Sequence, residues 1–379
     1  MQLKLWKWLS KSWHYLYFRS EGLKQDVLDA LSGRFPGKIP SKETLNHPGI
    51  INLLSGLDVY EQTPAAFDIT WQRLGIDIHV PLMKENTTRP RVPGGTWVED
   101  DRIYSDYGVF PTSMPLILPG STFALSEEQI FSYDPGRDDF NLADAIRDYR
   151  IYNQAFRTHF SDLAVMYELY YTTLFMWPVV TFEWIPFMLA AASDPQRFDE
   201  CLWQPWTRIS RKHFEVLAAC DEEVVFCHDD LAMGKGPVFS PTFLEKYILS
   251  RYAWIMEPVF KAGKKLIFVS DGNIDVLLER LLEFPISGIM YENPATPFER
   301  VLSTWGKAGR GFIGGISTTI LTNGTPEEVR QHTCQVIERG REYPGFIISS
   351  CGGLPGTIPM ENMLAYIHTR SEMGCYADI

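Results

Sequence analysis

The sequence lacks an uninterrupted apolar run of the length that a membrane-spanning helix needs, which is about 18 residues or more. The nearest stretch, from Tyr170 to Ser193, contains Glu183 and two prolines, Pro178 and Pro186. We therefore expect no membrane span. We interpret this stretch as a buried wall of the fold.

Cysteine pairs and positive charge are also scarce. None of the six cysteines forms a Cys-x-x-Cys pair in the 379 residues. Scattered cysteines in a long chain are typical of reduced thiols, so we expect a cytoplasmic protein without a disulfide framework. Lys plus Arg number 35 against 47 Asp plus Glu, a net charge of −12. This balance argues against nucleic acid as a partner, because phosphate binding needs clustered basic residues.

The N-terminus is unusual in composition. The segment MQLKLWKWLSKSWHYLYF places lysines between leucines and tryptophans. It is compatible with an amphipathic helix that seeks a surface. Alternatively, it is an arm that packs on its own fold or on a second subunit of a homodimer, which we favour. We find no small-residue cleavage site and do not interpret it as a signal peptide. Residues 1–24 are assigned to this helical arm and residues 25–379 to one domain.

From residue 21 onward, helical patterns alternate with short apolar runs that end in polar residues. Such alternation predicts a parallel sheet covered by helices. Five strand–helix units in the C-terminal half, with room for three before them, favour a single (β/α)₈ barrel. Residues 80–140, rich in Pro, Gly, Asp and Tyr, predict a long excursion over the barrel mouth, with a short strand at Arg102–Tyr104. The helices expected from the pattern are Leu23–Leu31, Leu142–Phe160, Pro195–Ala219, Pro241–Ala262, Ile274–Glu283, Pro326–Arg339 and Pro359–Thr369.

The chemistry of such a barrel lies at the C-terminal ends of its strands. There the sequence places carboxylates, one histidine, hydroxyls and one thiol. Asp271, Ser317 and Asn293 are equally compatible with helix caps or turns. Asp230 and Glu292 are harder to explain as caps, because each comes at the end of an apolar strand, at the mouth of the predicted barrel. The strand-end residues are His228, Asp229, Asp230, Asp271, Asn273, Tyr291, Glu292 and Cys351.

These residues lie in segments that resemble the uroporphyrinogen decarboxylase superfamily, which includes cobalamin-dependent methyltransferases. The matching pieces are HDDLAMGKGPVFSPTFLEKYILSRY, KAGKKLIFVSDGN, GGIS followed by NGTPEEVRQ, and FIISSCGGLPGTIPMENMLA. Upstream, DVLDALSGRFPGKIPS and RLGIDIHVPL match the opening of the family. The resemblance covers most of residues 25–370 and implies a (β/α)₈ barrel with a deep cleft.

The resemblance also bears on the reaction. The Arg-Gln-Ala-Gly-Arg motif with which uroporphyrinogen decarboxylases grip propionates is missing here. Zinc-dependent methyltransferases of the superfamily use a His-x-Cys pair and a later Cys. Those positions correspond to Val269, Asp271 and Cys351. Because valine cannot ligate, the usual thiol-activating zinc site is absent. A rearranged site of His228, Asp271, Glu292 and Cys351 stays open as an alternative.

The function that the resemblance implies is O-demethylation in one-carbon metabolism. The methyl group of a small methylated substrate, a methoxylated aromatic, would pass to cobalamin on a separate corrinoid-binding protein. We expect His228, Asp229, Asp230 and Glu292 to be catalytic, through carboxylates that raise one another's pKa. Substrate binding is assigned to Asp271, Asn273, Tyr291 and Cys351. Two alternatives stay open, namely a cofactor-free decarboxylase or lyase for another carboxylated substrate, and a barrel that only binds a small molecule or a partner.

Overall fold

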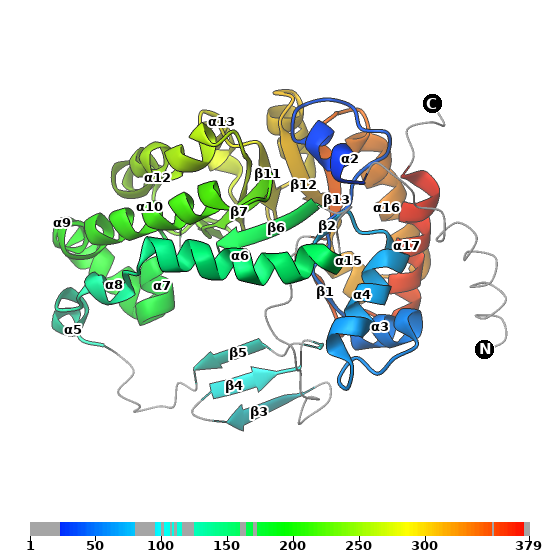
Figure 1. The fold of residues 1–379 in the computed structure, drawn as a ribbon, viewed down its shortest axis with the longest axis horizontal. Coiled ribbons are helices and arrows are strands. Elements are labelled where there is room, and N and C mark those ends of the chain that lie inside the picture. Colours follow the sequence, from blue (N-terminus) through cyan, green and yellow to red (C-terminus); the bar gives the residue numbers. More distant parts are fainter. Residues whose placement is uncertain are drawn as a thin grey trace. The chain divides into compact units, whose positions relative to one another are not determined.

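The computed structural model describes residues 23–79, 95–99, 102–106, 108–109, 112–115, 125–159, 164–169, 173–350 and 352–374. Nearly all of the predicted arm, and Cys351, lie outside these residues. The chain divides into two compact units, one of residues 1–116 with 313–379 and one of residues 117–312. Each unit is an α/β structure with parallel strands (Figure 1).

The unit of residues 117–312 is built on four neighbouring parallel strands, in the order β6, β7, β10 and β11. These strands are Ala164–Leu169, Val224–His228, Lys265–Ser270 and Gly288–Tyr291. The last three are almost wholly buried, as the apolar runs in the sequence predict for a covered parallel sheet. Residues 232–237 add a small hairpin of β8 (Ala232–Met233) and β9 (Gly236–Pro237) directly after β7.

Helices pack around these strands. The long helices α10 (Gln204–Ala219) and α12 (Ser250–Lys261) lie side by side, α6 (Leu142–His159) packs against α10, and α12 contacts β10 (Figure 1). The others are α5 (Glu127–Phe131), α7 (Trp177–Phe182), α8 (Trp184–Ser193), α9 (Pro195–Phe198), α11 (Pro241–Leu244), α13 (Leu278–Leu282) and α14 (Phe298–Val301). Shorter turns are the 3₁₀ segments η1 (Pro135–Asp138) and η4 (Asp275–Leu277), and the π turns η2 (Asp199–Trp203), η3 (Glu245–Leu249) and η5 (Leu302–Gly306).

One interpretation of the sequence is wrong in this unit. The stretch that we expected to be a buried wall forms α7 and α8 from residue 177 onward. Both helices leave apolar side chains in solvent, with Val180, Ile185 and Leu189 exposed by 58%, 62% and 64%. Overall hydrophobicity predicted burial, but these helices bury only one face each.

The other unit also contains parallel strands. Its elements are α2 (Leu23–Ala30), β1 (Leu45–Asn46), α3 (Pro48–Ser55), α4 (Thr63–Leu74), β2 (Ile78–His79), β3 (Thr96–Glu99), β4 (Arg102–Ser105), β5 (Thr112–Pro115), α15 (Thr318–Asn323), α16 (Pro326–Gly340), β13 (Phe346–Ser349), β14 (Leu354–Pro355) and α17 (Met360–Met373). β12 (Gly311–Gly315) begins at the boundary and lies next to β13. Parallel bridges join Ser41 to Ile348 of β13 and Lys42 to Ile78 of β2.

Within the predicted excursion, β3, β4 and β5 form an antiparallel sheet that includes the predicted strand at Arg102. The rings of Trp97 and Tyr104 stack across its first strand pair at 5.4 Å. In the described part of the chain, no helix is long and apolar enough to cross a membrane. The predicted α/β fold with parallel strands is therefore confirmed, and its closure into an eight-stranded barrel stays a prediction.

Candidate functional site

Three of the predicted site residues lie together where β7 and β10 end. His228 is the last residue of β7 and is the register partner of Val269 in β10. Asp271 follows β10 directly. Parallel pairing brings the C-terminal ends of both strands to the same edge, so His228, Asp230 and Asp271 meet although the two aspartates are 41 positions apart in the sequence.

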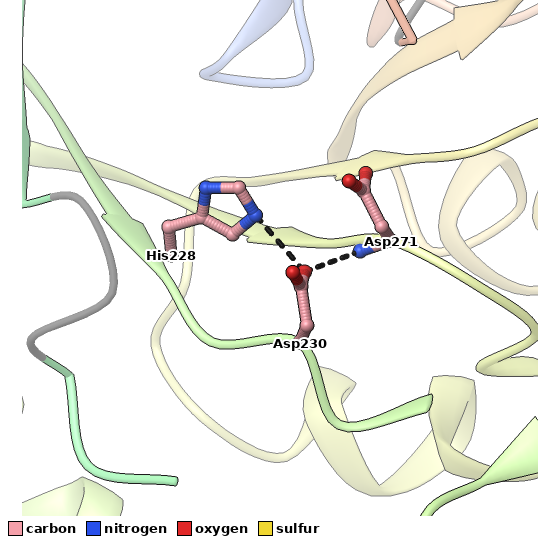
Figure 2. Close-up of side chains that lie close together, drawn as sticks. All are labelled: His228, Asp230 and Asp271. Carbon is pink, nitrogen blue, oxygen red and sulfur yellow. Dashed lines mark hydrogen bonds and ion pairs between the residues drawn. The ribbon is translucent and has the colours of Figure 1, made fainter. Parts of the chain in front are cut away.

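The three side chains form a compact polar group (Figure 2). Nε2 of His228 lies 2.9 Å from Oδ1 of Asp230. The backbone N–H of Asp271 donates to the same oxygen at 2.8 Å. One potential ligand atom from each of the three residues lies within 4.8 Å of the others. His228 is 6% and Asp230 is 7% exposed, so the pair is held away from bulk water, where its electrostatic interaction is stronger.

Asp229 points to the other side of the chain, as strand alternation requires for a residue between His228 and Asp230. Its Oδ2 accepts from the N–H groups of Leu174 and Phe175 at 3.0 and 2.8 Å, and its Oδ1 accepts from that of Met176 at 2.7 Å. The hydroxyl of Tyr252, on α12, donates to Oδ2 at 2.6 Å. Asp229 is fully buried and anchors the segment that precedes α7.

Burial raises the pKa of the Asp229 carboxyl to about 6, although its hydrogen bonds from Tyr252 and the backbone act in the opposite direction. The charge of Asp230 contributes least among the causes of this pKa shift. Burial, followed by the charge of Asp229, also raises the pKa of the Tyr252 hydroxyl. We expected like-charge repulsion to raise carboxyl pKa values in the cluster. For Asp229, desolvation is the main cause.

Glu292 follows β11 and approaches the loop after β10. Its Oε2 accepts from the N–H of Gly272 at 3.1 Å. Gly272 has φ +76°, and a Cβ there would lie 2.5 Å from the carbonyl oxygen of Ala232. Only glycine fits this close approach of two backbones without strain. Gly272 thus packs closely on the Ala232 backbone while its N–H donates to Glu292.

The remaining predicted site residues lie outside the group of His228, Asp230 and Asp271. Oδ1 of Asn273 accepts from the N–H of Asp275 at 3.1 Å, a local turn contact. Tyr291 is 1% exposed at the end of β11. Cys351 lies outside the described residues.

Sequence reasoning missed two residues that shape this site. Thr296 is fully buried; its hydroxyl donates to the carbonyl of Gly272 at 2.8 Å and accepts from the N–H of Ile274 at 2.9 Å. Tyr252 lies on a helix. Neither occupies a strand end, so the signal that we used could not find them.

The donor set is suited to a divalent metal. Imidazole nitrogen and carboxylate oxygens all ligate zinc, and the mutual distances of the His228, Asp230 and Asp271 atoms, all within 4.8 Å, are suited to one shared ion. The contacts of His228 and Asp271 with Asp230 hold the group together. Glu292 is not a member of this group among the described residues.

Comparison with known proteins agrees with the resemblance in the sequence. Residues 187–373 match the family model of uroporphyrinogen decarboxylase (URO-D). This matched segment, just under half of the chain, is similar to that family. The match includes all seven described site residues that the sequence predicted. No curated protein matches the chain.

A solved structure, a methyltransferase from Methanosarcina mazei, is similar to the chain with a TM-score of 0.59. The similarity covers 93% of this chain and 99% of that one, at 14% sequence identity. At such low identity the likeness establishes the fold, and the site has to supply the argument for an activity.

Proposed function

We propose that this protein is a methyltransferase that removes the methyl group from a methoxylated aromatic substrate and passes it to a separate corrinoid-binding protein. The observation that carries the proposal is the buried His228–Asp230 pair beside Asp271, at the C-terminal edge of neighbouring parallel strands. This edge is where enzymes with parallel α/β folds do their chemistry. The match of residues 187–373 to the URO-D family model and the similarity to a methyltransferase structure support it.

The difficulty of the reaction is the leaving group. An aryl methyl ether releases a phenolate, which leaves poorly unless its oxygen is protonated or polarised. The corrinoid partner would supply cob(I)alamin, the nucleophile for the methyl carbon. The chain must supply a group next to the ether oxygen that protonates or polarises it.

His228 is suited to this task. In this scheme the imidazolium form of His228 is the proton donor, and the carboxylate of Asp230 lies 2.9 Å from its Nε2. The C–O bond then breaks with its electron pair on oxygen, which takes the proton from His228. The carboxylate of Asp230 stabilises the imidazolium, and the Asp271 N–H fixes that carboxylate in place. Such general acid catalysis contributes about 10²–10⁴-fold in rate.

A divalent ion such as zinc would offer another way to polarise the ether oxygen. His228, Asp230 and Asp271 are the residues that would hold it. Asp229 has a positioning role in both schemes, because its oxygens are occupied by the segment before α7.

Decarboxylation of a different carboxylated substrate is the second candidate, and the family match favours it. It requires a cation that binds a substrate carboxylate. The reaction products separate the candidates, since one forms methylcobalamin and the other releases carbon dioxide.

The test is anaerobic absorbance spectroscopy of cob(I)alamin with the purified protein and a panel of methoxylated phenols and benzoates. We expect methylcobalamin to form, and Asp230→Asn and His228→Gln to slow it by about 10²-fold or more. Asp148→Asn, at an exposed position of α6, is the control and should leave the rate unchanged. Carbon dioxide release without methylcobalamin would establish the lyase. Full methyl transfer by both site variants would refute the assigned roles.

A further inference from the structure

Helix α8 is apolar on all of its faces, yet it lies at the surface of the unit of residues 117–312. Its sequence, WIPFMLAAAS, contains no charged residue. The inner face of the helix is formed by Phe187, Ala190 and Ala191, which are buried. On the outer face, Ile185 and Leu189 lie about one helical turn apart and are exposed by 62% and 64%. A helix that is hydrophobic all round is normally buried, so this outer face is typical of a surface that a partner covers.

Helix α7, which packs against α8, adds to the exposed apolar surface. Its Val180 is exposed by 58%. Trp184 and Met188, which neighbour the exposed pair on α8, are half-buried. We call the surface of these side chains the α7–α8 face; it consists of Val180, Trp184, Ile185, Met188 and Leu189.

Acidic side chains near the α7–α8 face indicate what kind of partner fits it. Glu183 and Asp194 are the exposed residues at the two ends of α8. Helix α5, which packs against α8, adds Glu127 and Glu128 (Figure 1). Glu128 pairs with Arg197, and in the described part of the chain no cation pairs with the other three carboxylates. These charges repel an anionic membrane surface and match a basic amphipathic helix.

The N-terminal segment of the chain, residues 1–20, has such a composition. It lies outside the described residues, and its sequence contains three lysines and one arginine but no Asp or Glu. The side chains of the segment therefore carry a formal charge of +4 in a chain whose net charge is −12. Its charge is complementary to that of the carboxylates near the α7–α8 face.

The spacing of side chains in this segment is that of an amphipathic helix. Lys4, Lys7 and Lys11 are three and four positions apart, so in a helix they share one face. Leu5 and Leu9 are four positions apart and would share the opposite face. As a helix, 20 residues span about 30 Å, which is twice the length of the 10-residue helix α8. An apolar face and a basic back of this length fit the α7–α8 face and its carboxylates.

We propose that the N-terminal segment of a second copy of this chain docks as an amphipathic helix on the α7–α8 face, and that two copies exchange these segments to form a homodimer. Reciprocal exchange produces a closed twofold assembly. It also forms two contacts, so each contact has to supply only half of the roughly 1,200–2,000 Å² that stable interfaces bury. The proposal is independent of the methyl transfer, because none of its residues belongs to the group of His228, Asp230 and Asp271.

The test is analytical ultracentrifugation of the full-length protein at micromolar concentration, where we expect the wild type to be a dimer. Leu189→Glu places a charge on the α7–α8 face, and Leu9→Glu places one on the apolar side of the segment. Each should weaken the dimer by about 10-fold or more in Kd, the scale of a central interface residue. Val276→Glu is the matched control, since Val276 is exposed by 62% outside the α7–α8 face, and it should leave the dimer unchanged.

Mixing the two variants tests the exchange between copies. Leu9→Glu keeps an intact face and Leu189→Glu keeps an intact segment, so one correct contact can form between them. We expect the mixture to form a heterodimer that is tighter than the homodimer of either variant. A mixture that associates no more tightly than the separate variants would mean that the segment packs on its own chain. Unchanged dimerisation of Leu9→Glu would mean that another surface of the second copy covers the face. Either result overturns the proposal.

A fluorescent peptide of residues 1–20 provides a direct readout by anisotropy. We expect it to bind the full-length Leu9→Glu protein, whose own segment competes poorly, and to bind the Leu9→Glu, Leu189→Glu double variant about 10-fold or more weakly. Added salt should weaken the binding, because exposed charges are screened. Leu189→Glu should leave the circular dichroism spectrum and the melting temperature nearly unchanged, since the side chain is mostly exposed. A monomeric wild type, or a peptide that does not bind, would overturn the proposal.

Discussion

Replacing Asp229 by Asn tests whether burial or hydrogen bonding controls the pKa of a buried carboxyl. Four donors converge on Asp229, three of them backbone N–H groups and one the hydroxyl of Tyr252. Carboxylates with that many donors often have a low pKa, whereas complete burial raises it. Here burial dominates, and the pKa of Asp229 rises from 3.8 to about 6.

The sign of the pH dependence follows. As the pH falls through 6, the folded protein takes up a proton at Asp229 before the unfolded chain does. The free energy of unfolding of the wild type should therefore rise, relative to Asp229→Asn, as the pH falls. From the two pKa values the gain between pH 7.5 and 4.5 is about 2 kcal/mol. The Asn variant cannot titrate at this position, so other ionisable groups cancel in the difference.

At neutral pH the variant has its own cost. If the Asn oxygen takes the place of Oδ2, it keeps three donors, and its NH₂ group meets the N–H of Met176. One unsatisfied buried donor costs about 1–3 kcal/mol. This free-energy cost does not change with pH, so it does not affect the predicted pH dependence of the stability difference.

The measurement is urea denaturation of both proteins at five pH values, followed by circular dichroism. If the free energies of unfolding of the two proteins change with pH in parallel, the pKa of Asp229 in the folded protein is close to that in the unfolded chain. A wild type that loses stability relative to Asp229→Asn on acidification would show that the hydrogen bonds outweigh burial. Either result refutes the reasoning.

Two further predictions concern the backbone. Gly272→Ala should lower the free energy of unfolding by about 2 kcal/mol or more and disrupt the site, because residue 272 has φ +76° and its new Cβ would collide with the carbonyl of Ala232. Gly263→Ala is the matched control, since Gly263 has φ +70° and open space around it, and it should cost less in urea denaturation. Thr325→Ala should lower the free energy of unfolding by about 1 kcal/mol, because Thr325 and Glu328 form a capping box at the start of α16. An unchanged midpoint for Thr325→Ala would mean that solvent replaces the cap.

Much of the fold could be predicted from local patterns. The helix expected at Leu142–Phe160 is α6, and the run expected at Pro241–Ala262 is helical throughout, with η3 as a π turn in its middle. Apolar runs marked the strands β7, β10, β11, β12 and β13 because a buried parallel strand must be apolar on both faces. The helices α7 and α8 were missed, since a long apolar segment does not reveal which residues a neighbour covers.

The site was predictable in part. Strand ends identified His228, Asp230 and Asp271, and parallel pairing brings them together. The same signal grouped Asp229 with them, although alternation sends its side chain to the opposite face. The pKa of Asp229 depends on burial, and so on residues far along the chain.

The sequence by itself determined the α/β class, the resemblance to the uroporphyrinogen decarboxylase superfamily and the residue types at the strand ends, because each depends on patterns within a short stretch of chain. Only the tertiary structure decided that His228 and Asp271 share Asp230 and that Tyr252 holds Asp229. Each of these facts depends on which distant segments exclude water from a side chain, and no local pattern in the sequence determines burial of that kind.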